Sequence, residues 1–424
     1  MPSKTDFDSR PWLKILVHTD SIADIHQISA FLELNLTEYI EIDVTPTKDT
    51  ELIKILTQNK IDVPEYYIED DHIAMRYHNG FKNAQSYSNR YDRIFSKYQS
   101  SVSNEDLLMS RRYDFFIIDE SDPLHNEKTL SNLATFCSVK KYLRIIFSNR
   151  GIFLHLHNQH LGEGWYYQIR ANKIFKCCKE YWSISVRLKD KYPSINRSMG
   201  SLWIRFNFLL RAYEKVAYYA LDLGHDDSHN NVLYHLGFFI LLCTGAFDEL
   251  AWIANDLYGF KLDKRKVGLR QPDFHKKLRR YKSAIADLLL EDKFMNMVNS
   301  FYPIRDSLQH RNYLSSYSLS SEGGSSQMIY LDEASASLLM PYVKLREMTS
   351  HENNEEKIQY SIHPGVLIEH LMDSFTEIIT RYVEALNWDD LKTQLSETDL
   401  KAVEASLEEN DREIELYTKD TMYI

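Results

Sequence analysis

The sequence has little of what marks the specialised protein classes. Among 424 residues there are only 13 glycines and 10 prolines, which excludes collagen-like, low-complexity and largely disordered chains. The cysteines are few and show no CxxC spacing, so neither a disulfide framework nor a structural zinc site is indicated, and a reducing cytoplasm fits. They are Cys137, Cys177, Cys178 and Cys243. With 44% apolar residues, the chain can form two or three packed domains.

Long apolar runs are also missing. No uninterrupted run reaches the roughly 18 residues of a membrane span, and the first dozen residues lack the apolar core of a signal peptide. The most apolar stretch, 232–254, contains His235, Asp248 and Glu249 and therefore predicts a buried core helix. We expect a soluble, cytoplasmic protein that does not contact a membrane. A Gly-rich phosphate loop and a GKS or GKT sequence are missing too, which disfavours an ATPase, and no cofactor is indicated.

The first 165 residues predict an α/β layered domain of unknown role. Short apolar runs alternate there with segments of helical period, and continuous apolar character is typical of strands covered on both faces. The expected strands are Leu13–Thr19, Tyr39–Val44, Tyr113–Asp119 and Leu143–Ser148, with helical segments at Ile22–Leu32 and Thr50–Thr57 and an edge hairpin at Tyr66–Gly80.

The remaining chain has long helical periods and predicts an all-α bundle over residues 166–388. Helices are expected at Phe206–Leu221, from Val232, at Asp273–Leu290, after Pro303 and from Pro364 to Leu386. An insertion over 315–362 begins with the flexible connection Ser315–Gln327 and holds short strands at Met328–Leu331 and Ile358–Ile362. An acidic segment, 389–424, ends the chain. The expected fold class is α+β multidomain.

The formal net charge of −11 argues against a protein that coats nucleic acid, but the charge is unevenly distributed. Residues 261–282, the basic segment, hold ten Lys or Arg and two acids, a balance of +8. Residues 389–420 hold eleven acids and four bases, a balance of −7. Because charges are screened beyond about 8–10 Å at physiological salt, the basic segment can attract phosphate whatever the net charge. A solvated helix face, neutralised by the acidic segment, is the alternative.

A possible catalytic motif follows the basic segment. Three Arg residues have a His five positions later, but Arg150–His155 lies in a strand-like run and Arg270–His275 is interrupted by Pro272. Arg305–His310 alone has a polar second residue, Asp306, and a helical setting after a long apolar helix. This pattern resembles the R-x4–6-H signature of the HEPN superfamily, over residues 201–386. The resemblance implies a HEPN-like bundle and an endoribonuclease.

Arg and His suit RNA cleavage without a metal. A neutral imidazole can take the proton of a ribose 2′-hydroxyl, and its protonated form can supply one to the leaving oxygen. A guanidinium can hold phosphate oxygens as charge develops. The resemblance implies a 2′,3′-cyclic phosphate product. We expect Arg305 and His310 to be catalytic and Asp306 to position them, and we expect RNA to be guided by basic side chains nearby, namely Lys276, Lys277, Arg279, Arg280 and Arg311.

The helical spacing favours a homodimer. Five residues rotate by about 140° on an α-helix, so Arg305 and His310 point in different directions, whereas Asp306 and His310 share a face. A composite site across a two-fold interface resolves this, as in the HEPN ribonucleases that the chain resembles. By that analogy the protein is a toxin or anti-phage defence effector with an N-terminal sensor domain that binds a regulatory partner or ligand. A catalytically silent dimerisation module is the alternative.

Two further clusters carry weaker predictions. The acids Asp20, Asp24, Asp119, Glu120 and Asp122 follow predicted strands, and ligands of open α/β sheets gather at such ends. They could bind a divalent ion as in a PIN-like nuclease, or be turn formers. His155, His157 and His160 lack a further metal ligand nearby and are interpreted as a polar strand end, so no metal site is predicted.

Overall fold

The structure is a computed structural model that describes most of the chain beyond residue 132 and shorter segments before it. The described residues are 13–19, 31–32, 40–45, 47–61, 63–69, 72–77, 85–88, 114–118, 133–155, 159–221, 226–281, 283–310, 314–321, 324–352 and 355–420. The chain divides into two compact units. The first comprises residues 1–147, 152–161 and 418–424, and the second comprises 148–151 and 162–417.

The first unit contains a parallel four-stranded sheet of order β2–β1–β6–β7. Its strands are β1 (Leu13–Val17), β2 (Ile40–Val44), β6 (Phe115–Ile117) and β7 (Leu133–Ala134). The apolar side chains at the end of β1 are fully buried, as expected for a central strand of a parallel sheet. Helix α2 (Thr50–Gln58) follows β2, and Asp49 caps it by accepting the N–H groups of Glu51 and Leu52.

A second, antiparallel sheet and one helix complete the described part of this unit apart from short segments. β3 (Pro64–Glu69), β4 (His72–Tyr77) and β5 (Gln85–Ser88) pair in that order, so the expected hairpin is present. The expected strand Leu143–Ser148 is wrong, because these residues belong to α4 (Phe136–Asn149). Val139, Leu143 and Phe147 are buried at every fourth position there, which is a helical row.

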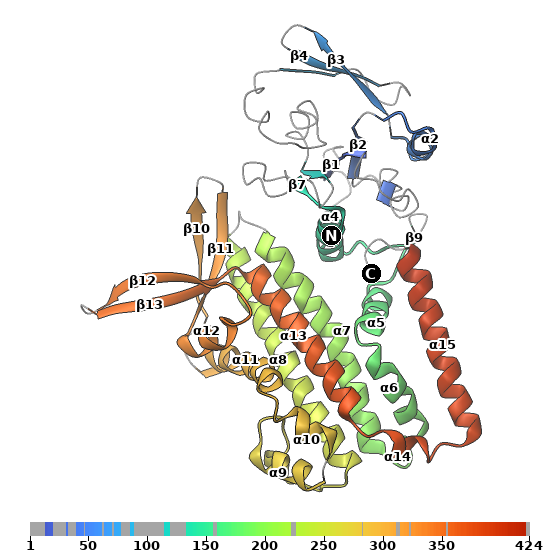
Figure 1. Ribbon diagram of the computed structural model, residues 1–424, viewed down its shortest axis with the longest axis vertical. Helices are drawn as coiled ribbons and strands as arrows, with labels where there is room; N and C mark the ends of the chain where they lie inside the picture. The colour runs from blue at the N-terminus through green and yellow to red at the C-terminus, as the bar shows by residue number, and fades with distance from the viewer. Residues whose placement is uncertain are drawn as a thin grey trace. The chain divides into compact units, whose positions relative to one another are not determined.

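The second unit is a bundle of long helices (Figure 1). They are α5 (Glu163–Ile174), α6 (Cys177–Arg187), α7 (Pro193–Leu221), α8 (Asp226–Leu257), α11 (Asp292–His310) and α13 (Pro364–Ala385). Rings from five of these helices and their ends meet in the core: Phe175 stacks on Phe206 at 3.8 Å between centroids, and Phe247 lies 5.3 Å from Phe301 and 5.8 Å from Phe375. This aromatic cluster explains why α7, α8, α11 and α13 carry apolar residues at helical spacing.

Several predicted helix boundaries in the bundle are wrong. α7 and α8 begin at Pro193 and Asp226, before the starts expected at Phe206 and Val232. The single helix expected at Asp273–Leu290 is divided into α9 (Pro272–Tyr281) and α10 (Ala284–Leu288), because Ser283 caps α10 by accepting the Ala286 N–H and so starts a new helix. The helix expected to begin after Pro303 instead contains it, since α11 begins at Asp292. Proline suits a first helical turn, but here the packing of α11 tolerates the missing backbone donor.

The insertion forms an antiparallel sheet of order β10–β11–β13–β12. Its strands are β10 (Ser316–Ser321), β11 (Gly324–Leu331), β12 (Arg346–Glu352) and β13 (Glu355–Ile362), with α12 (Glu333–Leu339) after β11. The expected flexible connection Ser315–Gln327 is therefore wrong: it is a ladder in which Ser316 opposes Ile329 and Ser321 opposes Gly324. The ring of Tyr317 stacks on that of Tyr330 at 4.5 Å, which supplies the apolar contact that the serines lack.

Helix α8 is long and apolar enough to cross a membrane by length and composition, within the described residues. Most of its apolar window is buried against the rest of the protein, as in the core helix of a soluble protein. The expected buried core helix is therefore supported. Together, the parallel and antiparallel sheets and the helical bundle confirm the α+β fold class.

The acidic segment forms α14 (Asp389–Lys392) and α15 (Glu397–Asp420). Asp411 accepts a hydrogen bond from Lys176 at 2.9 Å, and Lys392 pairs with Glu180 at 2.6 Å. Both contacts join the C-terminal helices to α6 or to the residue before it. Among the described residues no ion pair joins them to the basic segment, so the hypothesis that the acidic segment neutralises it receives no support.

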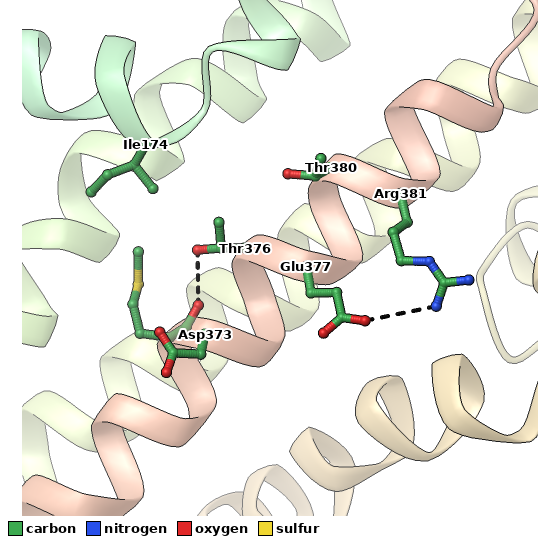
Figure 2. Close-up of a pocket in the computed structure, with 7 residues that line it drawn as sticks. Ile174, Asp373, Thr376, Glu377, Thr380 and Arg381 are labelled. Carbon is green, nitrogen blue, oxygen red and sulfur yellow. Dashed lines mark hydrogen bonds and ion pairs between the residues drawn. The ribbon is translucent and has the colours of Figure 1, made fainter.

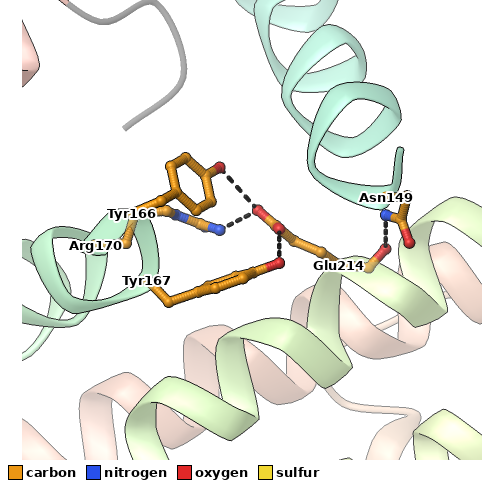
Figure 3. A network of polar contacts seen from close by, with 5 residues as sticks. All are labelled: Asn149, Tyr166, Tyr167, Arg170 and Glu214. Carbon is orange, nitrogen blue, oxygen red and sulfur yellow. Dashed lines mark hydrogen bonds and ion pairs between the residues drawn. The ribbon is translucent and has the colours of Figure 1, made fainter. Parts of the chain in front are cut away.

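Two features of the second unit involve α5: a cavity and a buried ion pair. A cavity of about 490 Å³ lies beside α13 and the end of α5, with Ile174, Thr376 and Thr380 in its lining (Figure 2). Elsewhere Arg170 of α5 forms a buried ion pair with Glu214 of α7, and Tyr167 donates to the same carboxylate at 2.7 Å (Figure 3). Because the side chains of this ion pair are at most 5% exposed, it is protected from screening by salt.

Candidate functional site

Helix α11 positions the motif predicted from the sequence. The Arg305 guanidinium donates through Nε and Nη2 to Asp306 Oδ1, at 3.1 and 2.9 Å, and its side chain is 31% exposed. His310 is the last residue of α11, but its side chain lies outside the described residues, as does Arg311. The structure thus brings Arg305 and Asp306 together, and the placement of the imidazole stays a prediction.

A polar cavity of about 300 Å³ lies beside Arg305. The loop before α9 forms one wall through the segment 267–271, α8 supplies Asp248, and α11 supplies Tyr302 and Arg305. Arg270 and Arg305 both lie against the ring of Tyr302, with Cζ atoms 4.2 and 4.8 Å from its centroid. Two guanidiniums in one cavity provide donors for the oxygens of a phosphate.

The electrostatics of this polar cavity are set by Asp248 and the arginines near it. Burial raises the pKa of Asp248, while the positive charges of Arg305 and Arg205 oppose that shift. Arg205 comes from α7, pairs with Glu249 at 3.8 Å and packs across Gly245, where an added Cβ would lie 2.5 Å from its Nη1. Arg205 and Arg305 thus act on Asp248 while each has a carboxylate partner of its own, Glu249 and Asp306. Acids and arginines are balanced here, and the cavity offers guanidinium N–H donors to an anionic ligand.

Tyr302 connects this polar cavity to the core. Burial, followed by the charge of Asp248, raises the pKa of Tyr302 to about 12, so its hydroxyl is neutral and can donate a hydrogen bond at physiological pH. Its ring provides the apolar surface that both guanidiniums cover, a geometry in which a cation interacts with the face of a ring. The ring of Tyr302 thus contacts the guanidiniums of both Arg270 and Arg305, and its neutral hydroxyl adds no charge to the cavity.

Arg305 also lines a second, apolar groove of about 420 Å³. It is lined by Asn230, Leu233, Tyr234, Gly237, Phe238, Leu241, Arg305 and Leu308. Tyr234, Phe238 and Leu241 follow one stripe of α8 and are 71%, 40% and 44% exposed. Exposed aromatic residues at this spacing form an apolar patch, and such patches mark interaction surfaces. Arg305 therefore lines both a polar cavity and an apolar groove.

Helix α9 presents the predicted basic side chains to solvent. Phe274 and Leu278 are buried, whereas Lys276, Arg279 and Arg280 are exposed. Lys277 is half-buried. Within the part of the chain that the structure describes, these four cations form no ion pair. Their charge is therefore available to a partner.

The remaining predicted sites are largely outside the described residues. This applies to Asp20, Asp24, Asp119, Glu120, Asp122 and His157. β1 and β6 are parallel neighbours, with Val17 opposite Ile117, but the acids that follow them are not described. His155 and His160 lie on the paired strands β8 (Leu154–His155) and β9 (Gln159–His160), not on one strand. Among described residues no group of three or more His, Cys, Asp or Glu could hold a metal ion.

Several residues in the polar cavity, or next to it in the case of Arg205, were missed by the sequence analysis. Arg205, Asp248 and Tyr302 carry no motif, and Arg270 was seen only as part of the basic segment and of a rejected spacing. Their proximity depends on the packing of α7, α8 and α11, and no spacing within one helix shows it. Comparisons with protein-family models, with curated proteins and with solved structures found no match to this chain.

Proposed function

We propose that this protein is a cytoplasmic, metal-independent endoribonuclease that acts as a homodimer. The observation that carries the proposal is the position of Arg305: it lines a polar cavity together with Arg270, and it also lines the exposed apolar groove of α8. The first cavity offers cations to a phosphate, and the second offers a surface to another copy of the chain. A defence or toxin role, with the first unit as a sensor, is the wider context of this proposal.

In the proposed reaction His310, Arg305 and Asp306 each have one role. His310 takes the proton of the ribose 2′-hydroxyl, or protonates the leaving 5′-oxygen, and the 2′-oxygen attacks the adjacent phosphorus to give a 2′,3′-cyclic phosphate. Arg305 holds the phosphate oxygens as charge develops. Asp306 occupies Nε and Nη2 of Arg305, which fixes the orientation of the guanidinium and leaves the Nη1 donors for phosphate.

The homodimer supplies the second half of the site. A two-fold interface places the same surface of each copy together, so this surface must contain both a protrusion and a recess. The α8 groove fulfils this: Tyr234 and Phe238 project from it, while Gly237 and Leu308 form its floor. An interface here brings the two copies of α11, and with them both pairs of Arg305 and His310, to one axis.

The basic face of α9 guides the RNA. Exposed Lys276, Arg279 and Arg280 follow the loop that contributes Arg270 to the polar cavity, so the backbone of one strand can run from this face to Arg305. Contacts of this kind are insensitive to sequence and weaken as salt rises.

A catalytically silent bundle is the second candidate, and one observation favours it. Arg305 already has a carboxylate partner in Asp306, as a purely structural arginine would. In that case the α8 groove would still join two copies, but the polar cavity would carry no chemistry.

The test is cleavage of total RNA in the presence of EDTA by wild type, Arg305→Ala and Arg412→Ala. Arg412 is a matched control because it lies on α15 with a side chain 79% exposed. We expect Arg305→Ala to lose at least about 100-fold in rate and Arg412→Ala to retain wild-type rate. Equal rates for the three proteins, or no cleavage by any, would favour the silent bundle, and cleavage abolished by EDTA would move the chemistry to the N-terminal acids.

A further inference from the structure

The adjacent residues Cys177 and Cys178 have no role in the proposed ribonuclease. They are the first two residues of α6, and their Sγ atoms are 3.8 Å apart. Cys178 is fully buried, whereas Cys177 is half-buried. Their thiols are therefore in contact, and only one of them is partly accessible.

Cys177 has the features of a reactive thiol. Its Sγ contacts Thr380 Oγ1 of α13 at 3.8 Å. The hydrogen bond with Cys178, and a weaker effect of the one with Thr380, lower the pKa of Cys177, although partial burial and the charge of Glu384 oppose this. In the same pair, the hydrogen bond and burial raise the pKa of Cys178. The two thiols thus differ: Cys177 ionises first, and Cys178 remains a thiol that donates to it.

A cavity lies beside a residue that contacts this pair, although the cysteines themselves are not part of its lining. Thr380, which contacts Cys177, also lines the cavity of about 490 Å³ beside α13 (Figure 2). In the figure Ile174, three residues before Cys177, faces the row of Thr376 and Thr380 on α13. Ile174, Met372 and the threonine methyl groups supply apolar lining, and the charged residues Asp373, Glu377 and Arg381 supply the rest. A small uncharged molecule such as hydrogen peroxide can fit this cavity.

We propose that Cys177 and Cys178 form a site of reversible oxidation by hydroperoxides. The Cys177 thiolate attacks the distal oxygen of the hydroperoxide, the O–O bond breaks, and an alkoxide or hydroxide leaves, so that Cys177 becomes a sulfenic acid. The Cys178 sulfur then attacks the Cys177 sulfur. The S–O bond breaks, the Cys178 proton joins the leaving hydroxide as water, and a disulfide joins the two neighbours.

The fold makes this disulfide easy to reverse. Adjacent Cα atoms are about 3.8 Å apart, closer than the roughly 4.4–6.8 Å usual for a disulfide, and the two sulfurs must approach each other from 3.8 Å. The first turn of α6 must therefore change when the bond forms, and strained disulfides are reduced readily by cellular thiols.

The experiment treats the full-length protein with limiting hydrogen peroxide and analyses its chymotryptic peptides by mass spectrometry. The peptide spanning 176–181 retains both cysteines. We expect it to lose two hydrogens, and to regain them with dithiothreitol, before Cys137 is oxidised. Cys137 is the matched control because it is exposed, so exposure alone would make it react first. In denaturant the preference for Cys177 should be lost.

Two variants separate the roles of the thiols. In Cys178→Ser, Cys177 should stop at the sulfenic acid, which a dimedone label detects, and in Cys177→Ser, Cys178 should stay reduced. Circular dichroism shows whether each variant is folded. Oxidation of Cys137 while the 176–181 peptide stays reduced would overturn the proposal, as would sulfinic acid at Cys177 with no disulfide stage in wild type.

Discussion

Arg270 and Arg305 are brought to one aromatic ring by the fold, their Cζ atoms 4.2 and 4.8 Å from the centroid of Tyr302. The first precedes α9 and the second lies in α11, and two cations this close repel each other unless something compensates. Asp248 lines the same cavity and Asp306 binds Arg305 directly, which supplies that compensation. The guanidiniums still have N–H donors that these acids do not occupy, such as Nη1 of Arg305, and a phosphate of RNA is the acceptor that we propose for them.

Arg270→Ala should weaken RNA binding. The guanidinium is expected to contact one phosphate, so its loss should reduce affinity about tenfold, since a charged hydrogen bond contributes about 1.5 kcal/mol. It should also reduce the slope of log Kd against log salt by about 0.7 for single-stranded RNA. Titration of a fluorescent RNA at several salt concentrations measures both. Arg412→Ala serves as the control, and an affinity for Arg270→Ala equal to that of this control would show that the polar cavity does not bind RNA.

Phe238→Asp should separate the homodimer. An aspartate would place a charge in the α8 groove, and loss of one aromatic anchor costs about 2 kcal/mol or more, a roughly 30-fold weaker association. Sedimentation at a range of protein concentrations measures this. Ile204→Asp is the control, because Ile204 is 59% exposed on α7 and does not line the groove. If the control dissociates and Phe238→Asp does not, the interface lies on α7 instead.

Glu214→Ala should be strongly destabilising. It leaves Arg170 charged and buried, and breaking a buried pair in this way costs about 3–5 kcal/mol. Replacing both partners, with Arg170→Met and Glu214→Leu, should recover most of that loss. Urea unfolding gives the free energies, with Glu397→Ala as the exposed control, since Glu397 pairs with Lys401 on the surface of α15. A loss in Glu214→Ala no larger than in the control would contradict a stabilising role.

His363 should make the second unit sensitive to acid. Its side chain caps α13 by accepting the Gly365 N–H at 3.1 Å, which requires an unprotonated Nδ1. Burial lowers the pKa of His363 from its usual 6.5, although Glu369 opposes this. Below about pH 6.5 the unfolded chain therefore binds more protons than the folded one, so stability falls as pH falls.

His363→Asn separates the cap from the titration. Asparagine is a good N-cap and does not titrate, so the variant should lose less stability than wild type between pH 7 and about pH 5. Thermal unfolding at both pH values measures the difference. Identical losses of stability in the two proteins would mean that His363 binds protons equally in the folded and the unfolded chain. That result would contradict the assigned role.

The sequence predicted those parts of the fold that depend on local pattern. The buried run of β1, the helical rows of α7 and the start of α13 at Pro364 follow from periodicity and from proline's preference for a first turn. The strand prediction for residues 143–148 was wrong because an apolar run of this length occurs both in buried strands and in buried helices. The prediction of a flexible connection at Ser315–Gln327 was wrong because serine and glycine are typical of loops. In the structure these residues pair as β10 and β11, and Tyr317 stacks on Tyr330.

The candidate site was predicted only in part for the same reason. Arg305 and Asp306 are neighbours on one helix, so their pairing is visible in the sequence. The polar cavity is lined by side chains from α8, α11 and the loop before α9, with Arg205 of α7 close to its Asp248, and these meet through tertiary packing alone. Arg205 and Asp248 are separated by 43 positions, and nothing in their local sequence indicates that they share a site.

The proposed ribonuclease activity is tested by cleavage of a defined single-stranded RNA with purified wild type and His310→Ala, both in EDTA. We expect wild type to produce fragments ending in a 2′,3′-cyclic phosphate and His310→Ala to be slower by about 100-fold or more. A copy of the RNA with 2′-O-methyl groups should resist both proteins. Equal cleavage by wild type and His310→Ala, or cleavage of the methylated RNA, would contradict the proposed mechanism.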